Sequence, residues 1–516
     1  MLTNVFWAIA LRTGQNAIEA SATFLCGLIV AGVMRRMLGA EGTRQLFGGP
    51  GWKGLLRAWA VGTLLPVCSL GVLPIAREMR RAGVPSGTIL AFVLAAPHIN
   101  PLSLLYGLTL SEPLVVVCFA AGSLLVALTG GAVWDRFLSR QNDTPPLADE
   151  QLPAPGLKRL TAVLVTAGRE AIGPAMVYVM LALLGTGLLA GLLPHGSLGT
   201  TMRHDDWKSP LLMTAVATPM YVGPLQGMMR LGLMFEHGNS VGAAFALFEL
   251  GIGVNIGLVC WLAGLFGWRR VLLWLTAVCA AALLLAFAVE RPLYFAHEEV
   301  SHTHAFDEWT SPFFSDQSVD FELVKTKLFE KLEILELVAL GGLAILVLIG
   351  LAVRLMNRHG RFESWLTNAP VTIRPPTIWN RPVPGPVLGV VALGGLIAFS
   401  VAALYIYYPA PKQAFEEITQ ARIGAIVAVR TGNREEAIRQ IQHWDLLTRK
   451  LQVGVFIRTG RMDPEATRLT EDLRERLEDL RDALLAGHLD EAKGMIPKVE
   501  EAYRNCRNAY LGTTDV

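Results

Sequence analysis

Two ionisable side chains stand in the middle of long apolar runs, where a charge is costly. His98 lies in the run 86–109 and Glu249 in the run 241–264. An acidic side chain at the centre of a membrane span costs about 2.5–3.5 kcal/mol on insertion scales, so such residues are functional by default. We expect Glu249, together with His98, to take up and release a proton near neutral pH. The alternative is a structural pair that braces two helices.

Breaks in the backbone supply a second kind of candidate. The apolar runs 55–76 and 210–229 are interrupted by prolines and glycines, so each could be a broken helix or a re-entrant hairpin. Unwound backbone inside a membrane is tolerated where it faces protein or a water-lined cavity. The candidate substrate-binding residues, at such breaks or inside the apolar runs, are Cys68, Ser69, Gly71, Pro97, His98, Asn100, Pro101, Tyr221, Glu249 and Asn255.

Three of these candidates have a chemical role and a structural alternative. The Cys68 thiol would be a soft ligand for a metal or metalloid, or a small buried apolar group. Asn100 and Asn255 could face each other as polar ends of a binding site, or they could join helices by hydrogen bonds.

A third group of candidates lies in the sequence AHEEVSHTHAFDE, within an acidic loop. His297, His302, His304 and Asp307 could bind a divalent metal, because imidazole and carboxylate are ligands of zinc, copper and nickel. The spacing differs from the HExxH of zinc proteases. The alternative is an exposed polar loop without a metal.

The composition points to a membrane protein. The chain has 516 residues, of which 52% are hydrophobic and 17% charged, whereas soluble domains carry about 25% charged residues. The last 106 residues hold 35 of the charges, which separates a polar tail from an apolar body. No basic block with interleaved aromatic residues indicates nucleic acid binding. Long apolar runs stand at 17–34, 86–109, 113–134, 172–193, 241–264, 270–289, 334–353 and 386–408.

The basic loops suggest a topology, since Lys and Arg collect on the cytoplasmic side. If 55–76 and 210–229 enter the membrane and return, the basic loops all fall inside. The acidic loop and the C-terminal tail then lie outside the cytoplasm. We therefore expect a multi-pass protein of the cell membrane with an extracytoplasmic C-terminal domain.

The chain also contains an internal repeat. Gly83, Gly87 and Asn100 have counterparts at 155 residues' distance, in Gly238, Gly242 and Asn255. Under the expected topology the two copies enter from opposite sides, which is the inverted repeat of many transporters. The alternative is that the GxxxG spacing only lets helices pack closely.

The stretch LPVCSLGVLPIAREMRRAGVPSGTILAFVLAAPHINPLSLLYGLTL (65–110) resembles the predicted permease family that includes organoarsenical efflux permeases. The stretches ATPMYVGPLQGMM and GAAFALFELGIGVN look like the degenerate second copy of that family. The resemblance covers about residues 15–290. Where the family has a second cysteine, this chain has Leu70.

These observations predict an all-α, polytopic membrane protein with an inverted-repeat permease core at 1–290, whose repeats span about 15–135 and 170–290. An acidic His-containing loop follows at 291–333, then two extra transmembrane helices with a basic connecting loop at 334–410. A soluble four-helix domain ends the chain at 411–516, with helices expected at 413–431, 434–459, 465–485 and 489–511.

We expect a permease and not an enzyme. It would export a small solute, such as a soft metalloid or metal species, through a midplane site. Proton coupling is expected because no GxxxxGK[ST] loop is present. The alternative is a membrane-anchored metal-sensing or assembly protein on a permease-like scaffold. The expected partners are the lipid bilayer, the solute and a protein docked on the C-terminal domain. A divalent metal at the histidine loop is the one cofactor considered.

Overall fold

The computed structural model describes residues 2–98, 113–140, 157–294, 305–313, 319–329, 331–356 and 408–512, with scattered positions between 387 and 405. Across these residues the secondary structure is helical, apart from a β-bridge between Arg203 and Asn239. The chain divides into two compact units, Met1–Ser400 and Val401–Val516. The all-α prediction is confirmed for the part of the chain that the structure describes.

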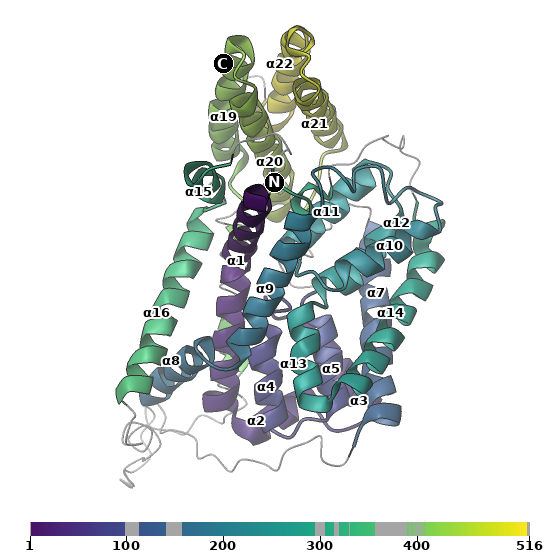
Figure 1. Cartoon of the computed structure of the whole chain (residues 1–516), viewed down its shortest axis with the longest axis vertical. Helices are drawn as coiled ribbons and strands as arrows, with labels where there is room; N and C mark the ends of the chain where they lie inside the picture. The colour runs from purple at the N-terminus through teal and green to yellow at the C-terminus, as the bar shows by residue number, and fades with distance from the viewer. Residues whose placement is uncertain are drawn as a thin grey trace. The chain divides into compact units, whose positions relative to one another are not determined.

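Unit 1 is built around its first helix, α1 (Leu2–Val33). In Figure 1 this helix lies between α9 (Ala175–Leu192) and α16 (Ile334–Met356), and it packs against both. The other elements of the unit are η1 (Met34–Leu38), α2 (Gly39–Phe47), α3 (Trp52–Thr63), α4 (Val72–Arg81), α5 (Ser86–Ala95), α7 (Pro113–Val133), η2 (Trp134–Leu138), α8 (Leu157–Ala171), α10 (Lys208–Ala217), α11 (Pro224–Glu236), α12 (Val241–Ala246), η3 (Leu247–Ile252), α13 (Ile256–Phe266), α14 (Trp268–Glu290), η4 (Asp307–Trp309) and α15 (Phe321–Phe329).

Several helices of unit 1 are long and apolar enough to cross a membrane. By length and composition they are Thr3–Phe47, Leu114–Leu138, Ala175–Leu192, Trp268–Glu290 and Ile334–Met356. Four of the predicted apolar runs, 113–134, 172–193, 270–289 and 334–353, correspond to α7, α9, α14 and α16. The runs 86–109 and 386–408 extend beyond the described residues. The prediction of a multi-pass membrane protein is confirmed.

Two predicted segments differ from the structure. The run 17–34 is only the second half of α1, which continues through Arg12. The Arg12 guanidinium is paired there, because it donates to the carbonyl oxygens of Thr310, at 3.0 Å, and Asp307, at 2.7 Å. The long apolar run 241–264, predicted as one membrane helix, is not a single straight helix. It bends by 54° between Val241–Ile252 and Ile256–Phe266, where the Asn255 side chain starts a new helix by accepting the Leu258 N–H at 2.9 Å.

Both interrupted runs are broken helices, as predicted. The first break lies between α3 and α4 and the second between α10 and α11. Pro224 stands at the first position of α11, where its missing N–H costs no helical hydrogen bond. That either break belongs to a re-entrant hairpin stays a prediction.

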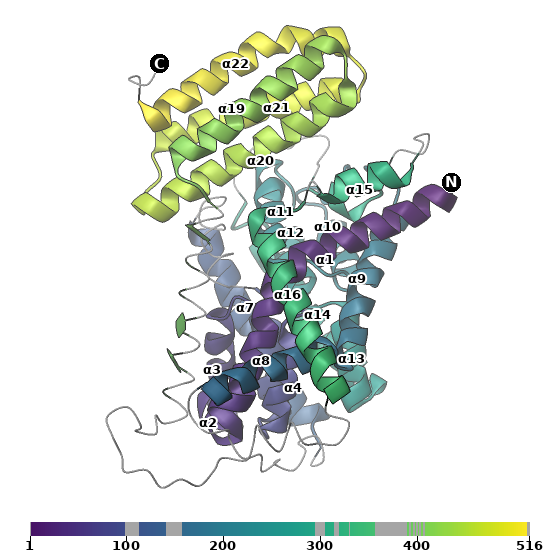
Figure 2. The same ribbon diagram turned by 90° about the vertical axis from the view of Figure 1, so that its left-hand side faces the viewer.

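Unit 2 contains α19 (Pro411–Thr431), α20 (Arg434–Thr459), α21 (Pro464–Leu485) and α22 (Leu489–Leu511), which lie side by side in Figure 2. Each begins and ends within two residues of its predicted bounds. The apolar faces of these helices form one core that includes Trp444, Leu477 and Cys506. The protein partner expected for this unit, and its side of the membrane, stay predictions.

A charge network ties α20 to α21 and predicts an acid-sensitive contact. Asp445 lies 2.9 Å from both Arg449 and Arg474. Burial opposes its ionisation, but the two arginines lower the pKa of Asp445 to about 2. Because the pKa of Asp445 is lower in the folded state than in the unfolded state, ionised Asp445 stabilises the fold above about pH 4. This stabilisation is lost as the pH falls from about 4 towards 2. Because the Asp445 side chain is 24% exposed, the contribution is at most about 2 kcal/mol.

Asp445→Asn should therefore destabilise unit 2 by up to about 2 kcal/mol at pH 7 and have little effect at pH 2. Amide-exchange protection of α20 and α21 in the full chain, corrected for the intrinsic pH dependence of exchange, measures the difference. Asp490→Asn is a suitable control, because the Asp490 side chain is fully exposed. Equal protection of the Asp445→Asn variant and the parent at pH 7 would contradict this prediction.

Candidate functional site

The first break places a thiol and a hydroxyl in irregular backbone inside unit 1. Cys68 and Ser69 are fully buried, between the end of α3 and the start of α4. Helix α1 approaches this break at backbone distance, because a Cβ atom added to Gly27 would lie 2.4 Å from the carbonyl oxygen of Gly71. Gly71, predicted as a site residue, therefore serves close packing at this point.

The second break buries Tyr221 against the same region. The backbone N–H of Tyr221 donates to the Thr186 hydroxyl of α9 at 2.6 Å. The Tyr221 hydroxyl is buried without a hydrogen-bond partner among the described residues. The side chains of Cys68 and Thr23 lie near this hydroxyl, but neither is placed to form a hydrogen bond with it. Cys68 and Tyr221, which were predicted separately as site residues, thus belong to one cluster.

A side-chain hydrogen bond joins the first break to the bend before α13. The Asn255 amide donates to the Ser69 hydroxyl at 3.0 Å, and both residues are fully buried. Asn255 therefore uses its amide nitrogen on Ser69 and its carbonyl oxygen on the Leu258 N–H. Asn100 and Pro101 lie outside the described residues, so the expected meeting of Asn100 with Asn255 stays a prediction.

His98 and Glu249 are also brought together, at the end of the turn that follows α5. Pro97 and His98 are buried in that turn, and Glu249 is buried in η3. His98 Nδ1 lies 3.8 Å from a Glu249 carboxylate oxygen. The hydrogen bond runs elsewhere, from His98 Nε2 to the backbone carbonyl oxygen of Glu249 at 2.9 Å. Neither carboxylate oxygen of Glu249 has a hydrogen-bond partner in the part of the chain that is described.

These contacts assign the protons of a neutral His98. A carbonyl oxygen only accepts, so Nε2 must carry the hydrogen of the bond to Glu249. Nδ1 then accepts from the Ser123 hydroxyl, which lies at 3.1 Å on α7. A second proton on Nδ1 would give up the Ser123 donation and face the Glu249 carboxylate. His98 and Glu249 therefore form one buried polar pair, in which the Glu249 carboxylate lies beside the imidazole ring.

A partly buried charge cluster beside the middle of α1 was not predicted from the sequence. Glu308 lies 2.5 Å from Arg230 and 2.7 Å from Lys331, and Lys331 lies 3.2 Å from Glu19. Burial opposes the ionisation of Glu308, but Lys331 and Arg230 hold the pKa of this carboxyl well below its usual range. The cluster fastens residues 305–313 to α1 and α11. It also explains how Arg230, a lone cation in an apolar run, is neutralised.

Only one residue of the metal site expected in the acidic loop belongs to the described chain. His297, His302 and His304 lie outside the described residues, and Asp307 opens η4. Elsewhere in the described chain no group of three or more His, Cys, Asp or Glu side chains could hold a metal ion. Metal binding at this loop therefore stays a prediction.

The comparisons with known proteins agree with the resemblance seen in the sequence. The family model ArsP_1, described as a predicted permease, matches residues 8–291. The UPF0718 protein YcgR of Bacillus subtilis (strain 168) is 33% identical over 87 residues, which is 17% of this chain and 30% of that protein. No solved structure matches the chain. Since the family model covers more than half of the sequence, the chain belongs to this predicted permease family.

Proposed function

We propose that the chain exports a small solute, a soft metalloid or metal species, and couples this export to proton movement. The observation that carries the proposal is the Glu249 carboxyl, which is fully buried with both oxygens free of hydrogen bonds among the described residues. An ionised carboxylate without a partner is costly in such surroundings, so the neutral acid is favoured there. Approach of a cation or opening to water would release the proton.

The nature of the solute is inferred from Cys68 and Tyr221. A thiol prefers soft metals and metalloids, and the Tyr221 hydroxyl beside it has an unused donor. Both groups stand at broken helices, which is where transporters bind solutes and ions. The Ser69–Asn255 hydrogen bond links this cluster to the bend that follows Glu249.

An internal repeat supports a transport mechanism. Helices α7 and α14 begin at Pro113 and Trp268, and α5 and α12 begin at Ser86 and Val241, so both pairs are 155 residues apart. Gly83 and Gly238, at the same offset, both have positive φ, 76° and 62°. We propose that the two copies have opposite orientations in the membrane and form the solute site between them.

Uptake of trivalent arsenicals and divalent metal ions into everted vesicles tests the proposal. Cys68→Ala should abolish the flux of a soft solute, whereas Cys118→Ala on α7 should leave it intact. Equal flux in the two cysteine variants would show that Cys68 does not bind the solute. Binding of these solutes without flux would favour the sensor or assembly protein.

A further inference from the structure

The first turns of α5 and α12 are the parts of unit 1 that carry a further inference. A glycine in the left-handed region, Gly83 or Gly238, precedes each helix. Here the segment from Gly83 into the start of α5 is called tip 1, and the segment from Gly238 into the start of α12 is called tip 2. The helix after tip 1 leads to His98, and the helix after tip 2 leads into η3 and Glu249. The position of each tip therefore affects one residue of the candidate site.

A carboxylate from a later helix holds tip 1. The backbone N–H of Gly87 donates to Asp135 Oδ1 at 2.9 Å. A Cβ atom added to Gly87 would lie 2.4 Å from this carboxylate, so only glycine allows the approach. A negative group at the N-terminal turn of a helix is stabilised by the unpaired N–H groups and by the helix dipole.

A second carboxylate holds tip 2 in the same way. The backbone N–H of Gly242 donates to Glu290 Oε2 at 2.5 Å. A Cβ atom added to Gly242 would lie 2.9 Å from that oxygen and 2.5 Å from the carbonyl oxygen of Ala286. Within each pair the glycine and the carboxylate are 48 residues apart, and the two pairs are separated by the repeat offset of 155. The two pairs agree in the contact, in the spacing and in the requirement for glycine, which indicates that the contact is part of the repeat.

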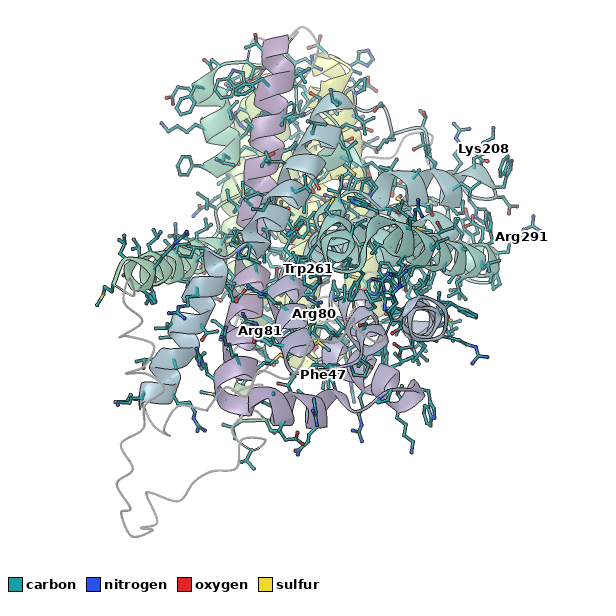
Figure 3. All side chains as sticks on the ribbon, turned by 60° about the horizontal axis from the view of Figure 1, so that its bottom comes forward. Phe47, Arg80, Arg81, Lys208, Trp261 and Arg291 are labelled. Carbon is teal, nitrogen blue, oxygen red and sulfur yellow. The ribbon has the colours of Figure 1, made fainter. Side chains whose placement is uncertain are left out.

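The two contacts differ in strength. Besides Gly242, Glu290 accepts from the Ser240 hydroxyl at 2.7 Å and the Asp205 N–H at 3.1 Å, and it lies 3.0 Å from His204 Nδ1. Asp135 bonds to Gly87, and its Oδ2 has no partner in the described chain. Figure 3 shows Arg80 and Arg81, just before tip 1, well apart from Arg291, the neighbour of Glu290. The tips are thus separate contacts of unequal strength.

We propose that Asp135 and Glu290 are positioning residues that fasten tip 1 to η2, which follows α7, and tip 2 to the end of α14, and that tip 1 opens more readily than tip 2. Opening of a tip moves the helix that carries His98 or Glu249. This inference rests on the proposed transport function for its purpose, although the contacts themselves can be tested without a solute.

Amide exchange of the full chain in lipid nanodiscs tests the proposal. In the parent, tip 1 should exchange faster than tip 2. Asp135→Asn should speed exchange about tenfold at tip 1 and leave tip 2 unchanged, because a neutral amide oxygen accepts the Gly87 N–H more weakly than a carboxylate does. Glu290→Gln should do the reverse. Glu41→Gln, on the exposed face of α2, is the control.

A double-mutant cycle separates this role from general support of the fold. Gly87→Ala displaces the Asp135 carboxylate but keeps its charge, so combining it with Asp135→Asn should give no more exchange at tip 1 than either change alone. Additive effects, or faster exchange throughout unit 1, would overturn the proposal.

Flux measurements give a readout that a purely structural role would not change. The contacts of the two carboxylates lie outside the described residues of the candidate solute site, so Asp135→Asn should alter the maximal flux per folded molecule and leave the half-saturating concentration unchanged. Unchanged maximal flux would overturn the positioning role. If the exchange results hold and the parent transports no tested solute, the tip contacts stand and the proposed function fails.

Discussion

Glu249→Gln is expected to eliminate proton-driven accumulation of the solute. A pH difference of one unit corresponds to about 1.4 kcal/mol per proton, which supports about tenfold accumulation if one proton moves per solute. Vesicles with the parent protein should show this accumulation, whereas vesicles with the variant should only equilibrate. The measurement is solute content at equal and at unequal pH across the vesicle membrane.

The physical reason is the isolation of this carboxyl. Glutamine has nearly the same shape and keeps the backbone carbonyl that accepts from His98 Nε2. It cannot carry a proton, so the change removes the charge chemistry and little else. Because neither carboxylate oxygen bonds to a described residue, the substitution breaks no hydrogen bond seen in the structure and the fold should persist.

Glu78→Gln is the matched control. Glu78 is also a buried carboxylate, but Arg81 lies 3.0 Å and Arg35 4.0 Å away. Its replacement should lower stability, because it removes the carboxylate that pairs with Arg81, yet accumulation per folded molecule should persist. If Glu249→Gln still accumulates solute against a pH gradient, the carboxyl is a structural brace and proton coupling lies elsewhere.

Local sequence patterns predicted much of the helical framework. In unit 2, Gly432 and Gly460 end α19 and α20 in the left-handed conformation, while Asn433 caps α20, and these are the residues that mark helix ends in a sequence. The bend after Ile252 was missed because Asn255 produces it through a side-chain cap, without a proline. An asparagine inside an apolar run gives no comparable local signal.

The contacts of the candidate site depend on residues far apart in the chain. The repeat offset drew attention to Gly87 and Gly242, and the same offset relates Asp135 to Glu290. Those two were overlooked because aspartate and glutamate are not identical and both lie at helix ends. The Ser69–Asn255 bond and the Arg230–Glu308 ion pair join segments separated by more than 70 residues, and only tertiary packing brings them together.

Gly27→Ala should disrupt the contact between α1 and the first break. The added Cβ would lie 2.4 Å from the Gly71 carbonyl oxygen and 2.6 Å from the Gly71 Cα. Both are backbone atoms, so no side-chain rotation can relieve the overlap, and α1 must move away from the break. Overpacking of this kind costs about 1–3 kcal/mol and occasionally more. The expected result is a lower apparent Tm and a smaller folded fraction in detergent, followed by tryptophan fluorescence and gel filtration.

Two glycines of α16 provide the comparison that tests this contact. A Cβ at Gly341 meets nothing within 4 Å, and one at Gly342 lies 2.8 Å from the Leu25 side chain, which can rotate. Gly341→Ala should keep or raise the apparent Tm, since alanine favours a helix by about 1 kcal/mol over glycine, and Gly342→Ala should have a small effect. The alanine variant of Gly27 should therefore be the least stable, that of Gly342 intermediate and that of Gly341 the most stable, according to the atoms that each added Cβ contacts. Equal stability of all three variants would mean that α1 does not pack against Gly71 at backbone distance, and Cys68 would then lose the wall that α1 forms beside it.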